Sequence, residues 1–239
     1  PCQFQELDCR PSKGLSAAVC KELQAKQKEH KARVAKQQEE ASAQQRLTAE
    51  QKMTSSISQG CKQVAQYSSA VAQRRALEVL PVATLRERAA ANPQKLDSPA
   101  DELIVQLLHW FKGEFFTWVD TLPCPRCGAG TTNTGMTQPT PEELAWGGSR
   151  VEVHTCTECG LDTRFPRYNS PVKLLETRRG RCGEWANCFT LCCIALGYEA
   201  RWVHDHTDHV WSEVWSEAQQ KFVMCDPCED TYDQPLLYE

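Results

Sequence analysis

The 239-residue chain has no run of 18 apolar residues and no apolar leading segment of the kind that directs export. Because a membrane-spanning helix needs about 20 predominantly apolar residues, we expect neither membrane insertion nor export. A strong excess of either charge is also missing, since 27 Lys and Arg residues stand against 31 Asp and Glu residues. The net charge of −4 gives no general reason to expect a nucleic-acid partner.

Aromatic residues are scarce in the first 109 positions, where only Phe4 and Tyr67 occur, and all seven tryptophans lie at position 110 or later. Residues 15–55 are instead rich in Ala, Gln, Lys and Glu, with weak hydrophobic periodicity. A segment of this composition cannot bury much apolar surface. It predicts a solvated helix or a disordered linker, and its mild excess of basic residues is typical of a solvated face.

From about residue 62 the apolar spacing becomes helical, and Pro81 interrupts the predicted helix. The tripeptide Asp97-Ser98-Pro99 is typical of the start of another helix. The buried stripe predicted for this second helix comprises Ile104, Leu107, Leu108, Phe111, Phe115, Trp118, Val119 and Leu122. We expect its aromatic residues to lie in the core, although Trp110 or Trp118 could instead line a cleft.

Cysteine is abundant, with 14 residues in the chain. Cys124-Pro-Arg-Cys127 and Cys156-Thr-Glu-Cys159 are two CxxC motifs, and a glycine follows each one. Two tight turns of this kind can supply four thiolates to one tetrahedral ion, so all four cysteines are predicted ligands of a single Zn2+. A closed site of four protein ligands predicts a structural ion rather than a catalytic one. Two disulfides or free thiols are the alternative.

Cys182 stands at the predicted start of a further helix. Apolar residues recur at helical spacing after it, and Gly197 is a typical helix stop. The helix dipole favours the thiolate form of a thiol at this place, and the free backbone N–H groups of the first turn can hold an oxyanion. Cys182 is therefore the predicted nucleophile, whereas Cys188, Cys192 and Cys193 lie within the helix and behave as small apolar residues.

Segments with the alternation of β-strands follow this helix. They are residues 199–204, 209–215 and 221–226. A four-residue loop, 216–219, is predicted to join the last two as a hairpin, and a symmetric fold about this loop puts His209 opposite Asp226. An imidazole that takes a thiol proton, oriented by a carboxylate, activates a cysteine nucleophile. We therefore predict a triad of Cys182, His209 and Asp226.

Other residues near the predicted triad could take different roles. His204 and His206 lie close to His209 in the sequence, and spacing alone does not exclude either as the base. Cys225-Asp-Pro-Cys228 is a third CxxC motif, which could indicate a redox site or another zinc pair. We favour neither, because Cys225 should point away from the face that carries Asp226 and no further CxxC motif could complete a zinc site.

Over about residues 76–239 the chain resembles the cytosolic peptide:N-glycanases of the transglutaminase-like superfamily. The matching stretches are Leu107-Leu-His-Trp-Phe111, Arg164-Phe-Pro-Arg-Tyr-Asn169, Gly180-Arg-Cys-Gly-Glu-Trp-Ala-Asn-Cys-Phe-Thr-Leu-Cys-Cys193, Thr207-Asp-His-Val-Trp211 and Cys225-Asp-Pro-Cys-Glu-Asp230. The resemblance implies a zinc-containing amidase that releases N-linked glycans from misfolded glycoproteins. Such an enzyme works through a thioester and leaves Asp in the peptide and a free 1-amino-glycan.

The resemblance assigns catalysis to Cys182, His209 and Asp226. It places sugar contacts on Arg201, Trp211, Glu213, Phe222 and Glu229. Phe222 stands where the family usually has tryptophan, so the aromatic face is kept while the indole N–H is lost. The family also implies a cytoplasmic location, a role in ER-associated degradation and a ubiquitin-shuttle or proteasome-linked partner.

Two alternatives remain open at this point. Another cysteine hydrolase, such as a transglutaminase or an isopeptidase, would use the same triad. The chain also ends at Glu239, soon after Asp226, whereas the fold of the resembling family continues. We therefore expect a core that is incomplete at its C-terminus, and a non-catalytic glycan- or protein-binding module is the second alternative.

These features together predict an α+β fold with a papain/transglutaminase-like cysteine hydrolase core, a four-cysteine zinc-binding lobe and an N-terminal helical extension. The expected divisions are a polar extension at 1–61, the helical part of the core at 62–123, the zinc-binding lobe at 124–160 and the catalytic core at 161–239.

Overall fold

The computed structural model describes residues 17–92, 96–205 and 209–237. The chain divides into two units, residues 1–59 and 60–239. In the first unit, the described residues belong to the long helix α1 (Ala17–Ala65), and nearly all of their side chains are exposed. Of the two predictions for this segment, the solvated helix is therefore the correct one. Within the described ranges, no helix is both long and apolar enough to span a membrane.

The second unit begins with short helical segments. They are η1 (Gln66–Ser68), α2 (Ala70–Val79), α3 (Val82–Ala91) and α4 (Pro99–Trp110). The interruption at Pro81 and the helix start after Ser98 were predicted, whereas η1 was not. Pro81 separates α2 from α3, as its missing N–H requires. Ser98 caps α4, because its hydroxyl accepts a 3.2 Å hydrogen bond from the backbone N–H of Asp101.

The prediction that the α4 stripe continues to Leu122 is wrong. A π-helical turn, η2 (Phe111–Phe115), ends the helix, and Phe116 is extended. The chain then forms the short strand β1 (Thr117–Trp118), which pairs in parallel with β5 (Arg179–Gly180). Leaving the helix lets the Phe116 ring stack on Phe111 at 5.1 Å between centroids. This packing and the strand pairing outweigh the helical spacing.

A three-stranded antiparallel sheet carries the two CxxC motifs at its edge. Its strands are β2 (Thr131–Thr137), β3 (Arg150–Cys156) and β4 (Asp162–Arg167), in that order. The helix α5 (Pro141–Ala145) lies in the connection between β2 and β3. We call residues 124–167 the cysteine lobe.

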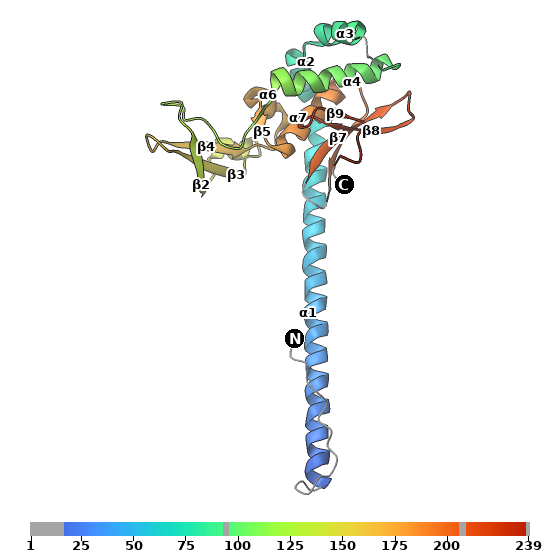
Figure 1. The fold of residues 1–239 in the computed structure, drawn as a ribbon, viewed down its shortest axis with the longest axis vertical. Coiled ribbons are helices and arrows are strands. Elements are labelled where there is room, and N and C mark those ends of the chain that lie inside the picture. The colour runs from blue at the N-terminus through green and yellow to red at the C-terminus, as the bar shows by residue number, and fades with distance from the viewer. Residues whose placement is uncertain (1–16, 93–95, 206–208, 238–239) are drawn as a thin grey trace. The chain divides into compact units, whose positions relative to one another are not determined.

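The core of the second unit is built around α7 (Cys182–Ala195), whose residues from Glu184 to Cys193 are all buried. It packs against α2, against α6 (Pro171–Thr177) and against a four-stranded antiparallel sheet. The strands of this sheet are β6 (Ala200–His204), β7 (Val210–Ser216), β8 (Lys221–Asp226) and β9 (Thr231–Tyr232). Figure 1 shows the sheet of the cysteine lobe and the four-stranded sheet on either side of α7.

The predicted register of the β7–β8 hairpin is wrong by two residues. Trp215 pairs with Phe222 and Glu213 pairs with Met224, so the turn is Glu217–Gln220 rather than 216–219. Gln220 adopts a left-handed backbone conformation with φ of 52° and closes the turn. The four-residue loop therefore lies one residue further along the chain than predicted. Because strand faces alternate with period two, the even shift leaves His209 and Asp226 on the same face.

Gly180, two residues before Cys182, is fixed by close packing. A Cβ atom added to it would lie 2.3 Å from Cβ of Glu184, which is far inside van der Waals contact. We predict that Gly180→Ala lowers the free energy of unfolding by about 1–3 kcal/mol, as overpacking does. Urea denaturation measures this change.

Gly183→Ala is the matched control, because nothing lies within 4 Å of a Cβ added there and alanine favours the helix. It should be neutral or stabilise the protein by up to about 1 kcal/mol. Equal effects of the two substitutions would contradict this account of the start of α7.

Candidate active site

Cys182 is the first residue of α7, as the sequence predicts, and its side chain is half-buried. Three hydrogen bonds fix the chain just before it. The carbonyl of Gly180 accepts from the backbone N–H of Val119 at 3.0 Å and from the indole N–H of Trp185 at 3.2 Å. The carboxylate of Glu184 accepts from the backbone N–H of Arg181 at 2.9 Å. The thiol therefore stands at a rigid helix N-terminus, beside the N–H groups of the first turn.

His209 and Asp226 form the pair that the hairpin predicts. Nε2 of His209 lies 2.9 Å from Oδ2 of Asp226, whose side chain is fully buried. The other carboxylate oxygen of Asp226 accepts from the backbone N–H groups of Cys228 at 2.7 Å and Glu229 at 3.4 Å. A carboxylate held in this way binds the protonated Nε2, which leaves Nδ1 as the basic nitrogen of the ring.

The backbone and ring of His209 are also held in place. Asp205 accepts a 3.1 Å hydrogen bond from the backbone N–H of His209 through its side chain and donates its own N–H to the His209 carbonyl at 3.0 Å. The ring of His209 stacks on Trp211 with 5.7 Å between centroids and 22° between planes. These contacts fix the direction in which the imidazole points.

Cys182 lies in the electrostatic neighbourhood of the Asp226 turn. Burial is the main cause that raises the pKa of the Cys228 thiol, and the negative charges of Asp226 and Cys182 raise it further. The sulfur of Cys182 and the carboxylate of Asp226 therefore both act on Cys228, which lies two residues after Asp226. Trp185 of α7 lines the same cavity as Cys228 and Glu229, so the start of the helix and the turn after β8 face one cavity.

The described alternatives to Cys182 and His209 differ from these two residues in their surroundings. His204 lies on β6 with its ring 5.6 Å from that of Trp202, whereas His209 is the histidine that binds the buried Asp226. His206 is outside the described residues. Among the helix cysteines, burial raises the pKa of Cys188 and Cys193 well above the usual value, which disfavours their thiolate forms. Cys182 is only half-buried and can meet a substrate.

Four of the five residues that the resemblance assigns to sugar contacts lie on one face of the four-stranded sheet. Arg201 on β6 pairs with Glu213 on β7, and its Nε donates to that carboxylate at 2.6 Å. The guanidinium carbon of Arg201 also lies 3.9 Å from the centre of the Phe222 ring. Trp211 is on the same face of β7 as Glu213, and its indole N–H is 3.5 Å from that carboxylate. Aromatic and charged groups thus extend along the strands from the His209–Asp226 pair.

The fifth residue, Glu229, lines a cavity of about 640 Å³. The cavity walls include Phe115, Phe116, Trp118, Trp185, Cys228 and Glu229. Trp118 is 44% exposed and its indole N–H donates to Asp120 at 2.8 Å, whereas Trp110 is buried. Of the two tryptophans that could line a cleft, Trp118 therefore does so, and the cleft lies beside the Asp226 turn.

The four predicted metal ligands come together in the cysteine lobe. The Sγ atoms of Cys124, Cys127, Cys156 and Cys159 all lie within 4.8 Å of one another. The backbone N–H of Cys127 is the main cause that lowers the pKa of Cys124, to about 6, and the N–H of Cys159 likewise lowers the pKa of Cys156. Four sulfurs clustered in this way fit one tetrahedral ion.

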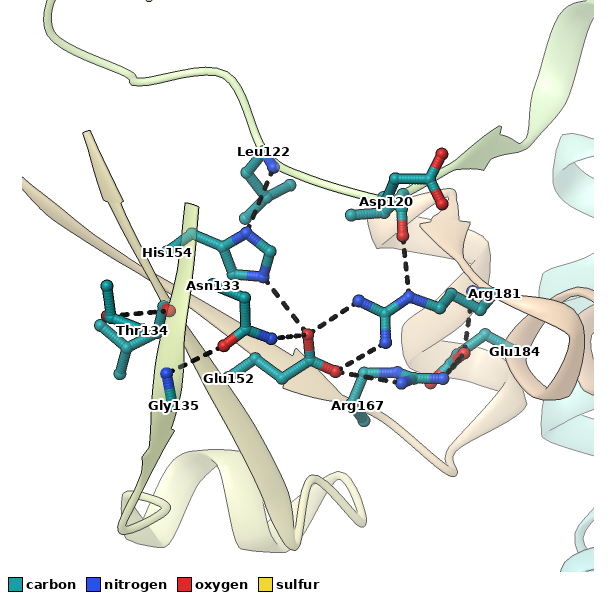
Figure 2. Close-up of polar contacts among 12 residues, drawn as sticks. Asp120, Leu122, Asn133, Thr134, Gly135, Glu152, His154, Arg167, Arg181 and Glu184 are labelled. Carbon is teal, nitrogen blue, oxygen red and sulfur yellow. Dashed lines mark hydrogen bonds and ion pairs between the residues drawn. The ribbon is translucent and has the colours of Figure 1, made fainter. Parts of the chain in front are cut away.

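A cluster of charged residues that the sequence analysis did not identify joins the cysteine lobe to the start of α7 (Figure 2). Both terminal nitrogens of Arg181 donate to Glu152 on β3, each at 2.8 Å. Arg167 at the end of β4 donates to Glu184 through Nε at 2.6 Å and through a terminal nitrogen at 2.7 Å. We call Glu152, Arg167, Arg181 and Glu184 the buried charge cluster. In the sequence, the only sign of this cluster is a pair of carboxylates, Glu152 and Glu184, at positions that face inward.

Comparison with known proteins agrees with this geometry. The model of the transglutaminase-like superfamily matches residues 131–227. A chicken (Gallus gallus) peptide-N(4)-(N-acetyl-beta-glucosaminyl)asparagine amidase is 53% identical over 182 residues, which make up 72% of this chain and 28% of the chicken protein. The amidase of the same name from rice (Oryza sativa subsp. japonica) is 47% identical over 185 residues, or 74% of this chain and 41% of the rice protein. The chain thus spans less than half the length of either relative.

Among solved structures, a Rad4–Rad23 complex bound to a 6-4 photoproduct UV lesion has a TM-score of 0.42 and 12% sequence identity. The match covers 77% of this chain and 39% of the other. A likeness at this level supports no statement about function.

The four-cysteine cluster leads us to predict the metal content of the purified chain. The purified chain should bind one metal ion, and Cys159→Ser should lose it, because three thiolates hold a tetrahedral ion much less tightly than four. Elemental analysis after gel filtration measures the ratio of metal to protein.

Cys228→Ser is the control, because Cys228 belongs to the third CxxC motif and lies outside the four-sulfur cluster. This variant should retain the ion. Loss of metal from Cys228→Ser alone would show that the ligands have been assigned wrongly.

Proposed function

Because residues 131–227 of this chain belong to the transglutaminase-like superfamily, and because the chain shares about half of its matched residues with peptide-N(4)-(N-acetyl-beta-glucosaminyl)asparagine amidases, we propose that it carries the catalytic centre of a deglycosylating amidase. The reaction cleaves the amide bond between an N-glycan and its asparagine. It leaves Asp in the peptide and releases a 1-amino-glycan. The observations that carry the proposal are the hydrogen bond between His209 and the buried carboxylate of Asp226, and the position of Cys182 at a helix N-terminus.

The chemistry begins with the Cys182 thiol. Nδ1 of His209 accepts the thiol proton, and the sulfur attacks the side-chain carbonyl carbon of the glycosylated asparagine. N–H groups in the first turn of α7 stabilise the oxyanion of the tetrahedral intermediate. The protonated His209 then donates its proton to the leaving glycosylamine, which breaks the C–N bond and leaves a thioester. Water, deprotonated by His209, hydrolyses the thioester to Asp and the free thiol.

Asp226 acts through His209. Its buried carboxylate accepts hydrogen bonds from Nε2–H of His209 and from two backbone N–H groups, so it has no freedom to turn away. The imidazole therefore keeps the tautomer with a basic Nδ1, and the negative charge stabilises the imidazolium ion that forms during the reaction.

The glycan lies along the face of the four-stranded sheet. Sugar rings pack their apolar faces on aromatic side chains, which Trp211 and Phe222 supply. Arg201 and Glu213 offer charged hydrogen-bonding groups between them, and Glu229 adds an acceptor on the other side of the His209–Asp226 pair. Phe222 provides ring surface but no indole N–H, so the hydrogen bonds in this region come from Arg201 and Glu213.

The ion in the cysteine lobe is zinc, with a structural role. Zn2+ prefers four thiolates in tetrahedral arrangement, and four protein ligands leave no position for water or substrate. The ion would link the turns that follow Leu122 and β3, at the edge of the sheet whose strands β3 and β4 carry Glu152 and Arg167.

The substrate class and location follow from the same proposal. The substrate is an N-glycosylated, misfolded or denatured glycoprotein, and a ubiquitin-shuttle or proteasome-linked protein is the expected partner. Four of the cysteines are assigned to the metal site and one to the nucleophile, and these roles need reduced sulfur. We therefore place the activity in a reducing compartment such as the cytoplasm.

The reaction is tested with a denatured high-mannose glycopeptide and mass spectrometry of both products. We predict conversion of the glycosylated asparagine to Asp and release of a 1-amino-glycan. Cys182→Ala should abolish release, and Asp226→Asn should lower kcat by about 10³- to 10⁴-fold, because the amide no longer enforces the right His209 tautomer.

Cys61→Ala is the matched control, since Cys61 is exposed and distant in sequence from the triad, and its activity should equal that of the wild type. Release of ammonia from glutamine, or cleavage of an isopeptide bond, with no change in the glycopeptide would identify another cysteine hydrolase or a transglutaminase. Full activity of Cys182→Ala would refute the assigned nucleophile.

A further inference from the structure

The buried charge cluster connects three segments that are distant in the sequence. Glu152 lies on β3, Arg167 at the end of β4, and Arg181 and Glu184 on either side of Cys182. Figure 2 shows the two guanidinium groups between the two carboxylates. Arg167 contacts both carboxylates, since it also donates to Glu152 at 3.2 Å. The cysteine lobe and the start of α7 are therefore joined by charged groups rather than by apolar packing alone.

Glu152 is the centre of this cluster. Its side chain is 3% exposed, and its two oxygens accept hydrogen bonds from Arg181, Arg167 and Asn133. Nε2 of the fully buried His154 lies 3.3 Å away. Burial alone would raise the pKa of the Glu152 carboxyl. The hydrogen bonds from Arg181 and Arg167 outweigh burial and lower this pKa to about 2. The group is thus an anion at neutral pH, and removing it would leave the partly buried guanidinium of Arg181 without its carboxylate partner, whereas Arg167 would keep Glu184.

The contacts of Arg181 connect Glu152 to Cys182, which is the next residue in the chain. Its two terminal nitrogens bind Glu152, its Nε donates to the Val119 carbonyl at 2.9 Å, and its backbone N–H donates to Glu184. Both the side chain and the backbone of Arg181 are therefore fixed. Adjacent Cα atoms are 3.8 Å apart, so a shift of Arg181 necessarily moves Cys182.

We propose that Glu152 is a positioning residue for the reaction, and that through its pairing with Arg181 the cysteine lobe sets the place of the Cys182 sulfur relative to His209. The inference rests on the proposed role of Cys182 as nucleophile. It gives the cysteine lobe a part in catalysis: the lobe supplies the anion that holds the residue before the nucleophile. Glu152 touches neither the substrate nor the reacting atoms.

The same lobe contains an ion pair that should lack this effect. Glu143 is 8% exposed, and its carboxylate accepts from Arg164 through Nε at 2.9 Å and a terminal nitrogen at 2.6 Å. Both residues belong to the cysteine lobe, and the two hydrogen bonds of this pair stay within the lobe. Glu143→Gln removes a buried, bidentate carboxylate as Glu152→Gln does, so it is a matched control for loss of stability.

The experiment compares wild type, Glu152→Gln and Glu143→Gln as full chains loaded with zinc. Steady-state kinetics with the glycopeptide gives kcat and KM, and peptide mass spectrometry gives the rate at which iodoacetamide alkylates Cys182. Glu152→Gln should lower kcat by about 10- to 100-fold with KM changed by less than about 2-fold, because a small misplacement of a reacting group is costly. Alkylation of Cys182 should slow by about 5-fold or more, while Glu143→Gln leaves both rates near those of the wild type.

Arg181→Lys covers the case in which Glu152→Gln does not fold. Lysine keeps the charge but replaces the two parallel hydrogen bonds by a single point contact, so it should fold and show an intermediate loss in kcat and in alkylation rate. Wild-type rates in a folded Glu152→Gln or Arg181→Lys, or equal losses in Glu143→Gln, would overturn the positioning role. If the wild type releases no glycan, the proposed function fails, and the alkylation rates alone still decide whether Glu152 positions Cys182.

Discussion

A single buried carboxylate, that of Glu152, sets the constraint on how the strands of the cysteine lobe meet the start of α7. Taking it out of water is favourable only if the guanidinium groups of Arg181 and Arg167 accompany it. Arg167 in turn binds Glu184, which accepts the backbone N–H at the start of α7. Strands β3 and β4 and the beginning of α7 must therefore assemble together. This assembly places the first turn of α7, where Cys182 lies.

The other half of the centre comes from the four-stranded sheet. Strand β7 packs on α7, and His209 immediately precedes that strand, while Asp226 ends β8. Because α7 is buried along nearly its whole length, the sheet and the helix cannot slide relative to each other without opening the core. The proposed nucleophile and the proposed base thus belong to two parts of the fold that are joined by packing, and each part has its own polar anchor. The anchors are Glu184 for the helix and the backbone N–H groups that hold Asp226 for the sheet.

Local signals in the sequence were enough to predict the start of α7, the cysteine cluster and the shared face of His209 and Asp226. The hairpin register could not be predicted, since it depends on the left-handed conformation of Gln220, a residue type that gives no sign of it. The end of α4 was missed because contacts of Phe116 with distant residues override helical spacing. Glu152 was missed for a similar reason: its partners are 15 and 29 positions away, and no local pattern indicates such pairs.

The central claim is that Cys182 and His209 act as one unit. Its most direct test is the rate at which iodoacetamide alkylates Cys182 near pH 6.5, measured without substrate in the wild type and in His209→Ala. If His209 takes the thiol proton, the wild-type rate should exceed that of His209→Ala by about 10-fold or more, and His204→Ala should match the wild type. Equal rates in the wild type and His209→Ala would contradict the account, because the imidazole would then play no part in forming the thiolate.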